Sequence, residues 1–173
     1  MSGDSAIPIR LLPQNSSVDA SGRLSIAGCD VGALVAEFGT PLFIYDEDHI
    51  RGNCRSLIGE FGVDRVVYAT KAFLCKAMAK LVNEEGLFLD VASGGELFVA
   101  LQAGVPASRC ILHGNNKSLE ELRMAVTHGV HHIVVDSFDE LTRLDALHLE
   151  GLPAPKIQLR MQPSHSLPTA QKL

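Results

Sequence analysis

The sequence predicts an α/β fold with parallel strands, because two patterns alternate along most of the chain. Apolar, strand-like runs recur at intervals of 21, 23, 22 and 25 residues. They begin near Val66, Leu87, Cys110, His132 and Ile157. Between them lie segments whose apolar residues have helical spacing and whose last residue is glycine. Strict alternation of strand and helix predicts parallel strands joined by right-handed crossovers.

Two architectures satisfy this alternation, a closed eight-stranded (β/α) barrel and an open doubly wound sheet. The periodicity does not separate them. No GxGxxG motif follows the first of the strand-like runs, which weakens the dinucleotide-binding form of the open sheet and leaves its other forms open.

The four helical segments of the alternating region are each bounded by polar residues and glycine. They are AMAKLVNEEG (77–86), GELFVALQAG (95–104), SLEELRMAVTHG (118–129) and SFDELTRLDALHLEG (137–151).

The N-terminal part of the chain has a different pattern, rich in turn residues up to about Gly28. RLSIAG (23–28) predicts a short edge strand, and DVGALVAEFG (30–39) predicts a helix with an aspartate cap. TPLFIYD (40–46) predicts a strand, since its proline suits the first strand position. A further helix is expected from Glu47 to about Phe61.

Composition narrows the classes of protein that the chain can belong to. A hydrophobic content of 46% in 173 residues is enough for one ordinary domain. A net charge of −5 without a basic run predicts no nucleic-acid partner. No apolar run reaches the roughly 20 residues of a membrane span, and the polar N-terminus lacks a secretory core, so we expect a cytoplasmic protein.

The four cysteines predict neither a metal site nor a disulfide framework. Cys29, Cys54, Cys75 and Cys110 are scattered, with no CxxC pair and no histidine at zinc-ligand spacing. We expect four reduced thiols, most of them buried.

Polar residues follow each of the five predicted strands. The loops that leave the carboxyl ends of parallel strands converge on one opening, so these residues are expected to lie close to it. They are Lys71, Asp90 with SGGE (93–96), HGNNKS (113–118), Asp136 with Ser137, and Arg160. Some of these residues are explained by local structure alone. Ser118 with Glu121, and Ser137 with Glu140, are predicted to be capping boxes, and Gly94 and Gly95 can serve a tight turn.

Lys71, Asp90, His113 and Arg160 are not needed as caps, and each is costly in an apolar interior unless paired. Lys71 ends the strand-like run VVYATKAF (66–73). A desolvated lysine can attack an aldehyde to form a Schiff base. A contact with a substrate carboxylate and a structural ion pair remain alternatives for Lys71.

Four segments resemble the pyridoxal-phosphate-dependent diaminopimelate decarboxylases, relatives of the ornithine and arginine decarboxylases. They are EFGTPLFIYDEDHIR (37–51), YATKAF (68–73), LDVASGGEL (89–97) and ILHGNNKS (111–118). The likeness extends from about Gly22 to Arg160, and HGNNKS is in the form typical of diaminopimelate decarboxylases.

The resemblance implies a partial (β/α)8 TIM barrel of the alanine-racemase-like type, with about five barrel strands in residues 41–161. Residues 1–40 would be a lead-in that belongs partly to the family's β domain, and residues 162–173 a divergent tail. Lys71 would hold pyridoxal 5'-phosphate covalently and act in catalysis. Asp90, His113 and Arg160 would line the cofactor site, with Asn115 on the same rim. The resemblance further implies an amino-acid substrate, a homodimer and no metal.

The sequence also departs from the family pattern. A complete barrel has eight strands in roughly 250 residues, and this chain has five strand-like runs. The histidine that stacks on the cofactor ring, the glycine-rich phosphate loop and the acidic partner of the pyridine nitrogen are missing. We therefore expect a fragment with little decarboxylase activity by itself.

Several functions stay open beside the decarboxylation of meso-diaminopimelate to lysine. An ornithine- or arginine-type decarboxylase is the alternative enzyme. A non-catalytic chain that binds a full-length relative is the alternative outside enzymes, because five strands leave an unpaired hydrophobic edge. Alanine racemases and simple cofactor-binding barrels are more distant possibilities.

Overall fold

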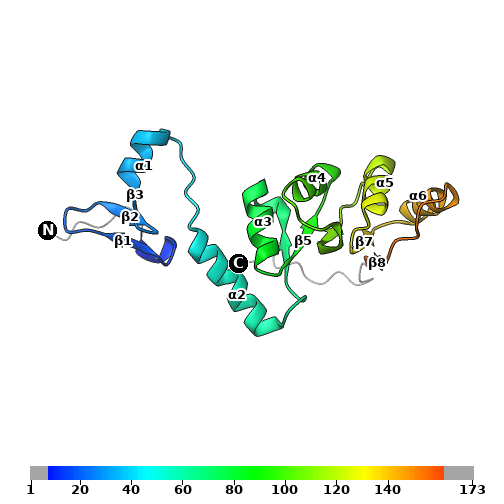
Figure 1. Cartoon of the computed structure of the whole chain (residues 1–173), viewed down its shortest axis with the longest axis horizontal. Helices are drawn as coiled ribbons and strands as arrows, with labels where there is room; N and C mark the ends of the chain where they lie inside the picture. Colours follow the sequence, from blue (N-terminus) through cyan, green and yellow to red (C-terminus); the bar gives the residue numbers. More distant parts are fainter. Residues whose placement is uncertain (1–7, 162–173) are drawn as a thin grey trace, which may run out of the picture. The chain divides into compact units, whose positions relative to one another are not determined.

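The computed structural model describes residues 8–161, and the chain divides into two compact units, residues 1–60 and 61–173 (Figure 1). The first unit contains a three-stranded antiparallel sheet in the order β1-β2-β3. Its elements are a 3-10 turn (Ile9–Leu11), β1 (Ser16–Val18), β2 (Leu24–Ile26), β3 (Cys29–Asp30), α1 (Val31–Phe38) and α2 (Glu47–Phe61), which runs to the unit boundary.

Three predictions for the first unit can be compared with the structure. Asp30 caps α1 as expected, because its side chain accepts a hydrogen bond of 2.8 Å from the Ala33 N–H. The helix from Glu47 to Phe61 is confirmed. The strand within RLSIAG exists, but β2 is the central strand of its sheet rather than an edge strand. Its partners β1 and β3 are too short and too polar to produce a strand pattern.

The strand predicted at TPLFIYD is wrong. Residues 42–46 belong to no strand, since their backbone has no neighbouring strand with which to form a ladder. Phe43 is 84% exposed instead, while Leu42 and Ile44 are half-buried. Asp46 begins helix α2 by accepting a hydrogen bond of 3.0 Å from the His49 N–H.

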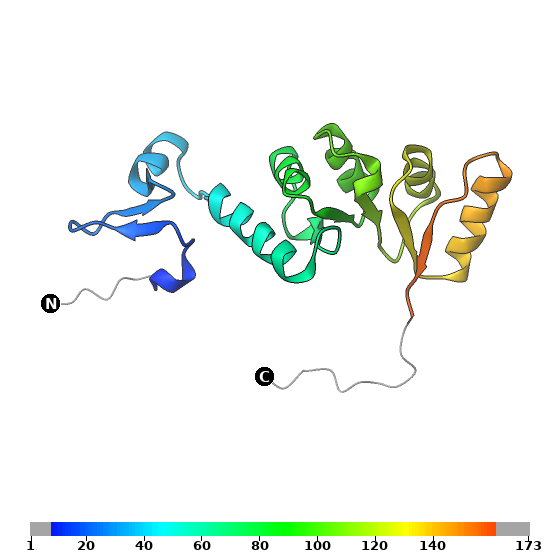
Figure 2. The ribbon, with the colours of Figure 1, turned by 60° about the horizontal axis from the view of Figure 1, so that its bottom comes forward.

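The second unit is built on five parallel strands in the order β4-β5-β6-β7-β8, as the alternation predicted (Figure 2). The strands are β4 (Val67–Ala69), β5 (Phe88–Val91), β6 (Cys110–Leu112), β7 (His132–Val135) and β8 (Ile157–Leu159). The helices between them are α3 (Lys76–Glu84), α4 (Gly94–Gln102), α5 (Leu119–His128) and α6 (Phe138–Leu149). Two 3-10 turns, Thr70–Ala72 and Ala107–Arg109, complete the connections.

The core of the second unit lies between the sheet and its helices. Successive side chains on a strand point to opposite faces, and one face of each inner strand is fully buried. The largest buried side chains of this layer are Leu89, Leu112 and Ile133 from the strands and Val82, Leu97, Leu122 and Leu147 from the helices. Burying a side chain of this size contributes roughly 1.5–3 kcal/mol.

The opposite face of the sheet is open and carries polar side chains among apolar ones. A shallow hollow of about 540 Å³ lies there, and its lining includes Asp90, Ile111, His132, Val134 and Gln158. The strands therefore pack one face against the helices and line a hollow with the other, where Phe88 and Ile111 are buried and His132 and Val134 are half-buried.

All four cysteines are free, as predicted, although only Cys54 and Cys110 are buried, and Cys29 is exposed. Burial raises the pKa of the Cys110 thiol to about 11. Between residues 8 and 161, no helix is both long and apolar enough to cross a membrane. The divergent tail expected at residues 162–173 lies outside the described residues.

Candidate functional site

The carboxyl ends of the five parallel strands carry the residues that the sequence singled out. Lys71 lies in the 3-10 turn that follows β4, and its side chain is exposed. Because Lys71 is exposed, the free-energy cost of burying its ammonium group does not arise. Asp90 is on the neighbouring strand β5, where the positive charge of Lys71 acts on its carboxylate.

Asp90 and His113 form a polar pair at the neighbouring strand ends of β5 and β6. The Oδ2 atom of Asp90 lies 3.4 Å from Nε2 of His113, and both side chains are partly buried. Burial raises the pKa of the Asp90 carboxyl, while the nearby His113 and Lys71 favour its ionised form. The backbone N–H of His113 donates a 2.9 Å hydrogen bond to the Val91 carbonyl, which continues the β5–β6 pairing to the strand ends.

Thr70, directly before Lys71, is held on two sides. Its side chain is almost completely buried, and its hydroxyl lies 2.8 Å from both the carbonyl oxygen of Asp90 and Oε2 of Glu96. The same oxygen of Glu96 accepts a 2.6 Å hydrogen bond from the Ala92 N–H. These contacts connect the turn that carries Lys71 to the end of strand β5.

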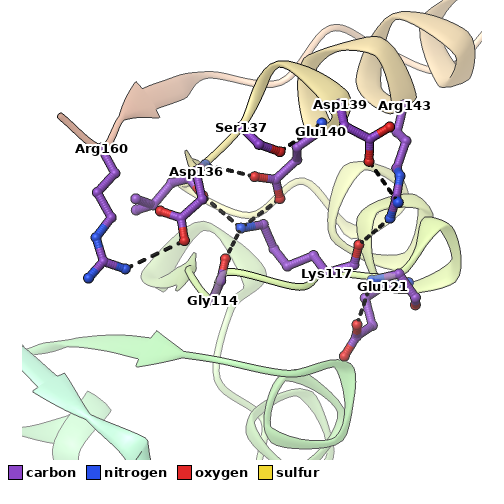
Figure 3. Close-up of polar contacts among 11 residues, drawn as sticks. Gly114, Lys117, Glu121, Asp136, Ser137, Asp139, Glu140, Arg143 and Arg160 are labelled. Atoms are coloured by element: carbon purple, nitrogen blue, oxygen red, sulfur yellow. Dashed lines mark hydrogen bonds and ion pairs between the residues drawn. The ribbon is translucent and has the colours of Figure 1, made fainter. Parts of the chain in front are cut away.

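The loop HGNNKS contains a buried lysine that the sequence analysis did not single out. The Lys117 side chain is 1% exposed, and its Nζ lies 2.6 Å from Oε1 of Glu140. Nζ also donates to the carbonyl oxygen of Val134 at 2.7 Å and to that of Gly114 (Figure 3). Three acceptors match the three protons of the ammonium group, so the buried charge is fully paired.

Gly114 in the same loop is required by its conformation and by its surroundings. Its φ angle is +112°, a region that disfavours other residues, and an added Cβ would lie 2.8 Å from the Ala92 carbonyl oxygen. The loop after β6 can therefore approach the loop after β5 only because this position has no side chain.

Arg160 and Asp136 form a second polar group on the same rim. Their side chains lie 3.5 Å apart at the ends of β8 and β7 (Figure 3). Together with Asn115 and Ser137 they line a hollow of about 280 Å³. Lys71 and Arg160 follow the two opposite edge strands of the sheet. The cofactor-site role predicted for these residues therefore involves both ends of the described sheet, β4 and β8.

The serine–glutamate pairs were predicted to be capping boxes, and this is right for one of the two. Ser118 and Glu121 form both hydrogen bonds of a capping box. Ser137 accepts the Glu140 N–H, but the Glu140 carboxylate binds Lys117 and the Asp136 N–H instead of the Ser137 backbone. A local pattern predicted the cap and could not reveal the distant lysine.

Thr70 was missed, and Glu96 and Lys117 were not singled out within SGGE and HGNNKS, the segments expected on the rim. A signal for Glu96 was present, because Ser93 and Glu96 have the same spacing as the two predicted boxes. No signal marked Lys117, since a lysine among asparagines and serine is ordinarily solvated.

Comparison with known proteins gives a consistent family assignment. Residues 47–172 match the family described as the pyridoxal-binding domain of pyridoxal-dependent decarboxylases. Diaminopimelate decarboxylase of Mycobacterium tuberculosis is 53% identical over 136 residues, which are 78% of this chain and 30% of that protein. The Bacillus subtilis enzyme of the same name is 47% identical over 146 residues, or 82% of this chain and 33% of that protein. The chain thus spans about a third of the length of these curated relatives.

Solved structures support the same relation. A diaminopimelate decarboxylase from M. jannaschii has a TM-score of 0.76 at 30% identity, covering 88% of this chain and 37% of that one. A lysine/ornithine decarboxylase from Vibrio vulnificus, complexed with putrescine, has a TM-score of 0.70 at 27% identity, covering 84% and 38%. These likenesses confirm the expected partial barrel, since the five parallel strands correspond to part of the decarboxylase barrel fold.

Proposed function

Because the chain belongs to the family of pyridoxal-dependent decarboxylases, we propose that it carries the lysine-bearing part of the cofactor site in an enzyme that converts meso-diaminopimelate to lysine. The observation that supports this most directly is the grouping of Lys71, Asp90 and His113 at adjacent strand ends. All three lie in segments that resemble the family motifs.

The described residues fit the aldehyde end of pyridoxal 5'-phosphate. Lys71 offers an exposed primary amine, the group that bonds to an aldehyde carbon. When bound, the cofactor takes up the electron pair that remains after a carboxyl group leaves as CO₂. Lys71 would hold the cofactor and exchange places with the substrate amine.

Asp90 and His113 would orient the amine and hold a proton beside it. The partly buried Asp90 carboxylate lies near both Lys71 and His113, so it can keep Lys71 directed toward the strand ends. Arg160 would line the cofactor site from the other edge strand, where Asp136 pairs with its guanidinium group. Asn115 lines the same small hollow as Arg160.

The choice of diaminopimelate as substrate is supported by the names of several similar curated proteins. Relatives called diaminopimelate decarboxylase are 43–53% identical to this chain in mycobacteria, Corynebacterium and Bacillus. An M. jannaschii diaminopimelate decarboxylase has been solved in complex with L-lysine, the product expected of this reaction. The HGNNKS loop is the part of this chain that argues for the same substrate.

The test is covalent trapping of the cofactor. The chain is mixed with pyridoxal 5'-phosphate, reduced with borohydride and digested, and the modified lysine is located by mass spectrometry. We expect the label on Lys71 and its loss in Lys71→Ala, while Lys76→Ala, which removes a nearby exposed lysine, leaves the labelling unchanged. Label spread over several surface lysines would contradict the proposed role. A spectral change of the loaded chain with meso-diaminopimelate, and a smaller one with ornithine, would support the substrate.

The location and assembly of the enzyme are part of the same proposal. Four free thiols are compatible with a reducing compartment, and we propose that the enzyme is cytoplasmic. We also propose a homodimer, as the family resemblance implies. Sedimentation of the purified protein measures its mass in solution, and a strictly monomeric species over a wide concentration range would contradict the dimer.

A further inference from the structure

Three helices of the second unit begin in the same way. A serine caps each helix by accepting the N–H of a glutamate three residues later, and these pairs are Ser93 with Glu96, Ser118 with Glu121, and Ser137 with Glu140. Each glutamate carboxylate also accepts a backbone N–H from its own strand–helix loop. The donors are Ala92 at 2.6 Å, Ser118 at 2.9 Å and Asp136 at 2.9 Å.

Each of these glutamates makes a second contact that a helix cap does not need. Glu96 accepts from the Thr70 hydroxyl, and Glu121 accepts from the Gly94 N–H at 2.7 Å. Glu140 pairs with Lys117. The partners Thr70 and Lys117 lie in the preceding strand–helix connection, and Gly94 is the first residue of the preceding helix α4, so each carboxylate links two neighbouring strand–helix connections of the rim.

The first of these links is adjacent to the reactive lysine. Thr70 is only 1% exposed, and a hydroxyl group this deeply buried is costly unless it is hydrogen-bonded. Its single proton has two acceptors within reach, Glu96 Oε2 and the Asp90 carbonyl oxygen, each 2.8 Å from the hydroxyl oxygen. The backbone that carries Lys71 is therefore fixed against the backbone that carries Asp90.

We propose that Thr70 and Glu96 are positioning residues that hold Lys71 in place relative to Asp90. This inference rests on the proposed role of Lys71 as the cofactor lysine. Neither residue contacts the amine itself. They act by fixing the turn at Thr70–Ala72, whose other side faces solvent, so that the Lys71 amine meets an incoming aldehyde from one direction.

The inference is tested by changing each partner of the link and measuring trapping at Lys71. Thr70→Val keeps the side-chain volume and removes the hydroxyl, while Thr70→Ser keeps the hydroxyl. Glu96→Ala removes the carboxylate, while Glu96→Gln keeps an acceptor oxygen. The measured quantities are the rate of borohydride-trapped pyridoxal phosphate on Lys71 and the cofactor dissociation constant.

We expect Thr70→Val and Glu96→Ala each to slow trapping by up to about 100-fold, since misplacement of a reacting group has effects of this order. The double variant should be no slower than Glu96→Ala alone, because both changes break one link. Thr70→Ser and Glu96→Gln should restore most of the rate. The control is Glu150→Ala, which removes a 2.6 Å ion pair with Arg123 in the helical layer and should leave trapping unchanged.

Each outcome bears on one of the two proposals. Trapping at an unchanged rate in Thr70→Val and Glu96→Ala would overturn the positioning role and leave the cofactor role of Lys71 intact. If the unaltered chain is not trapped at Lys71, the proposed function fails instead. Amide hydrogen exchange then tests the link directly. Faster exchange in the turn at residues 70–72 in Glu96→Ala, with Glu150→Ala unchanged, supports the link, and equal exchange in both variants overturns it.

Discussion

The two faces of the five-stranded sheet differ in what they contribute to the protein. On strand β7, Ile133 and Val135 face the helices and are 0% and 3% exposed, whereas His132 and Val134 line the open hollow and are only half-buried. The helix-covered face holds most of the apolar core and supplies stability. The open face and the strand ends hold the ionisable groups, which can act there because water and ligands reach them.

The largest expected effect is a difference in stability between variants of Lys117, which is buried, and Lys71, which is exposed. Lys117→Ala leaves Glu140 buried without its partner and should reduce the free energy of unfolding by about 3–5 kcal/mol. Lys71→Ala removes an exposed side chain and should change stability by less than about 0.5 kcal/mol. Chemical denaturation of both variants measures the difference. Equal losses of unfolding free energy in the two variants would contradict this difference between Lys117 and Lys71.

The second prediction compares two valines that are neighbours on strand β7. Val135→Ala removes methyl groups from the covered face and should cost about 1.5–3 kcal/mol of unfolding free energy. Val134→Ala makes the same chemical change on the open face and should cost less than about 1 kcal/mol. The comparison uses denaturant midpoints under identical conditions. A larger loss for Val134 would mean that another element covers the open face.

The third prediction concerns the charge of Asp90. Burial raises the pKa of this carboxyl above its ordinary value, so the ionised form is disfavoured in the folded protein. The associated stability is present below the unfolded pKa and is lost as pH rises through the folded pKa. Asp90→Asn should therefore raise the melting temperature at neutral pH, by a margin that shrinks on acidification. It should also weaken cofactor trapping. A lower melting temperature of Asp90→Asn at neutral pH would contradict the predicted direction of the effect.

The smallest effect is expected from His132 on the open face. Burial and the neighbouring His131 lower the pKa of His132 below its ordinary value of about 6.5. The stability linked to its neutral form is complete above the unfolded pKa and is lost as pH falls through the folded pKa. His132→Gln should flatten the decline in stability below about pH 6.5, whereas the exposed His128→Gln should not. If stability declines with falling pH equally steeply in both variants and in the unaltered protein, His132 does not cause the decline.

Much of the fold follows from local patterns. The five strands and four helices of the second unit lie where the alternation of apolar runs placed them, because each repeat buries its own strand against its own helix. The first unit was less predictable. TPLFIYD has a strand-like composition, but strand formation depends on a partner backbone that the segment itself does not contain.

The site was predictable where chemistry and strand ends coincide. Asp90 and His113 were both expected on the rim, and the structure pairs them. The links made by Glu96 and Glu140 were not predicted, because each joins residues 23 to 26 positions apart and has no local pattern of its own.

By itself, the sequence determined the alternation of strands and helices and the polar residues that end each strand, because periodicity and turn chemistry are local properties. The tertiary structure alone decided which of two lysines is buried, which carboxylate binds which loop, and which face of the sheet the helices cover. These outcomes depend on the distances between residues from different repeats, and those distances exist only after the repeats have packed against one another.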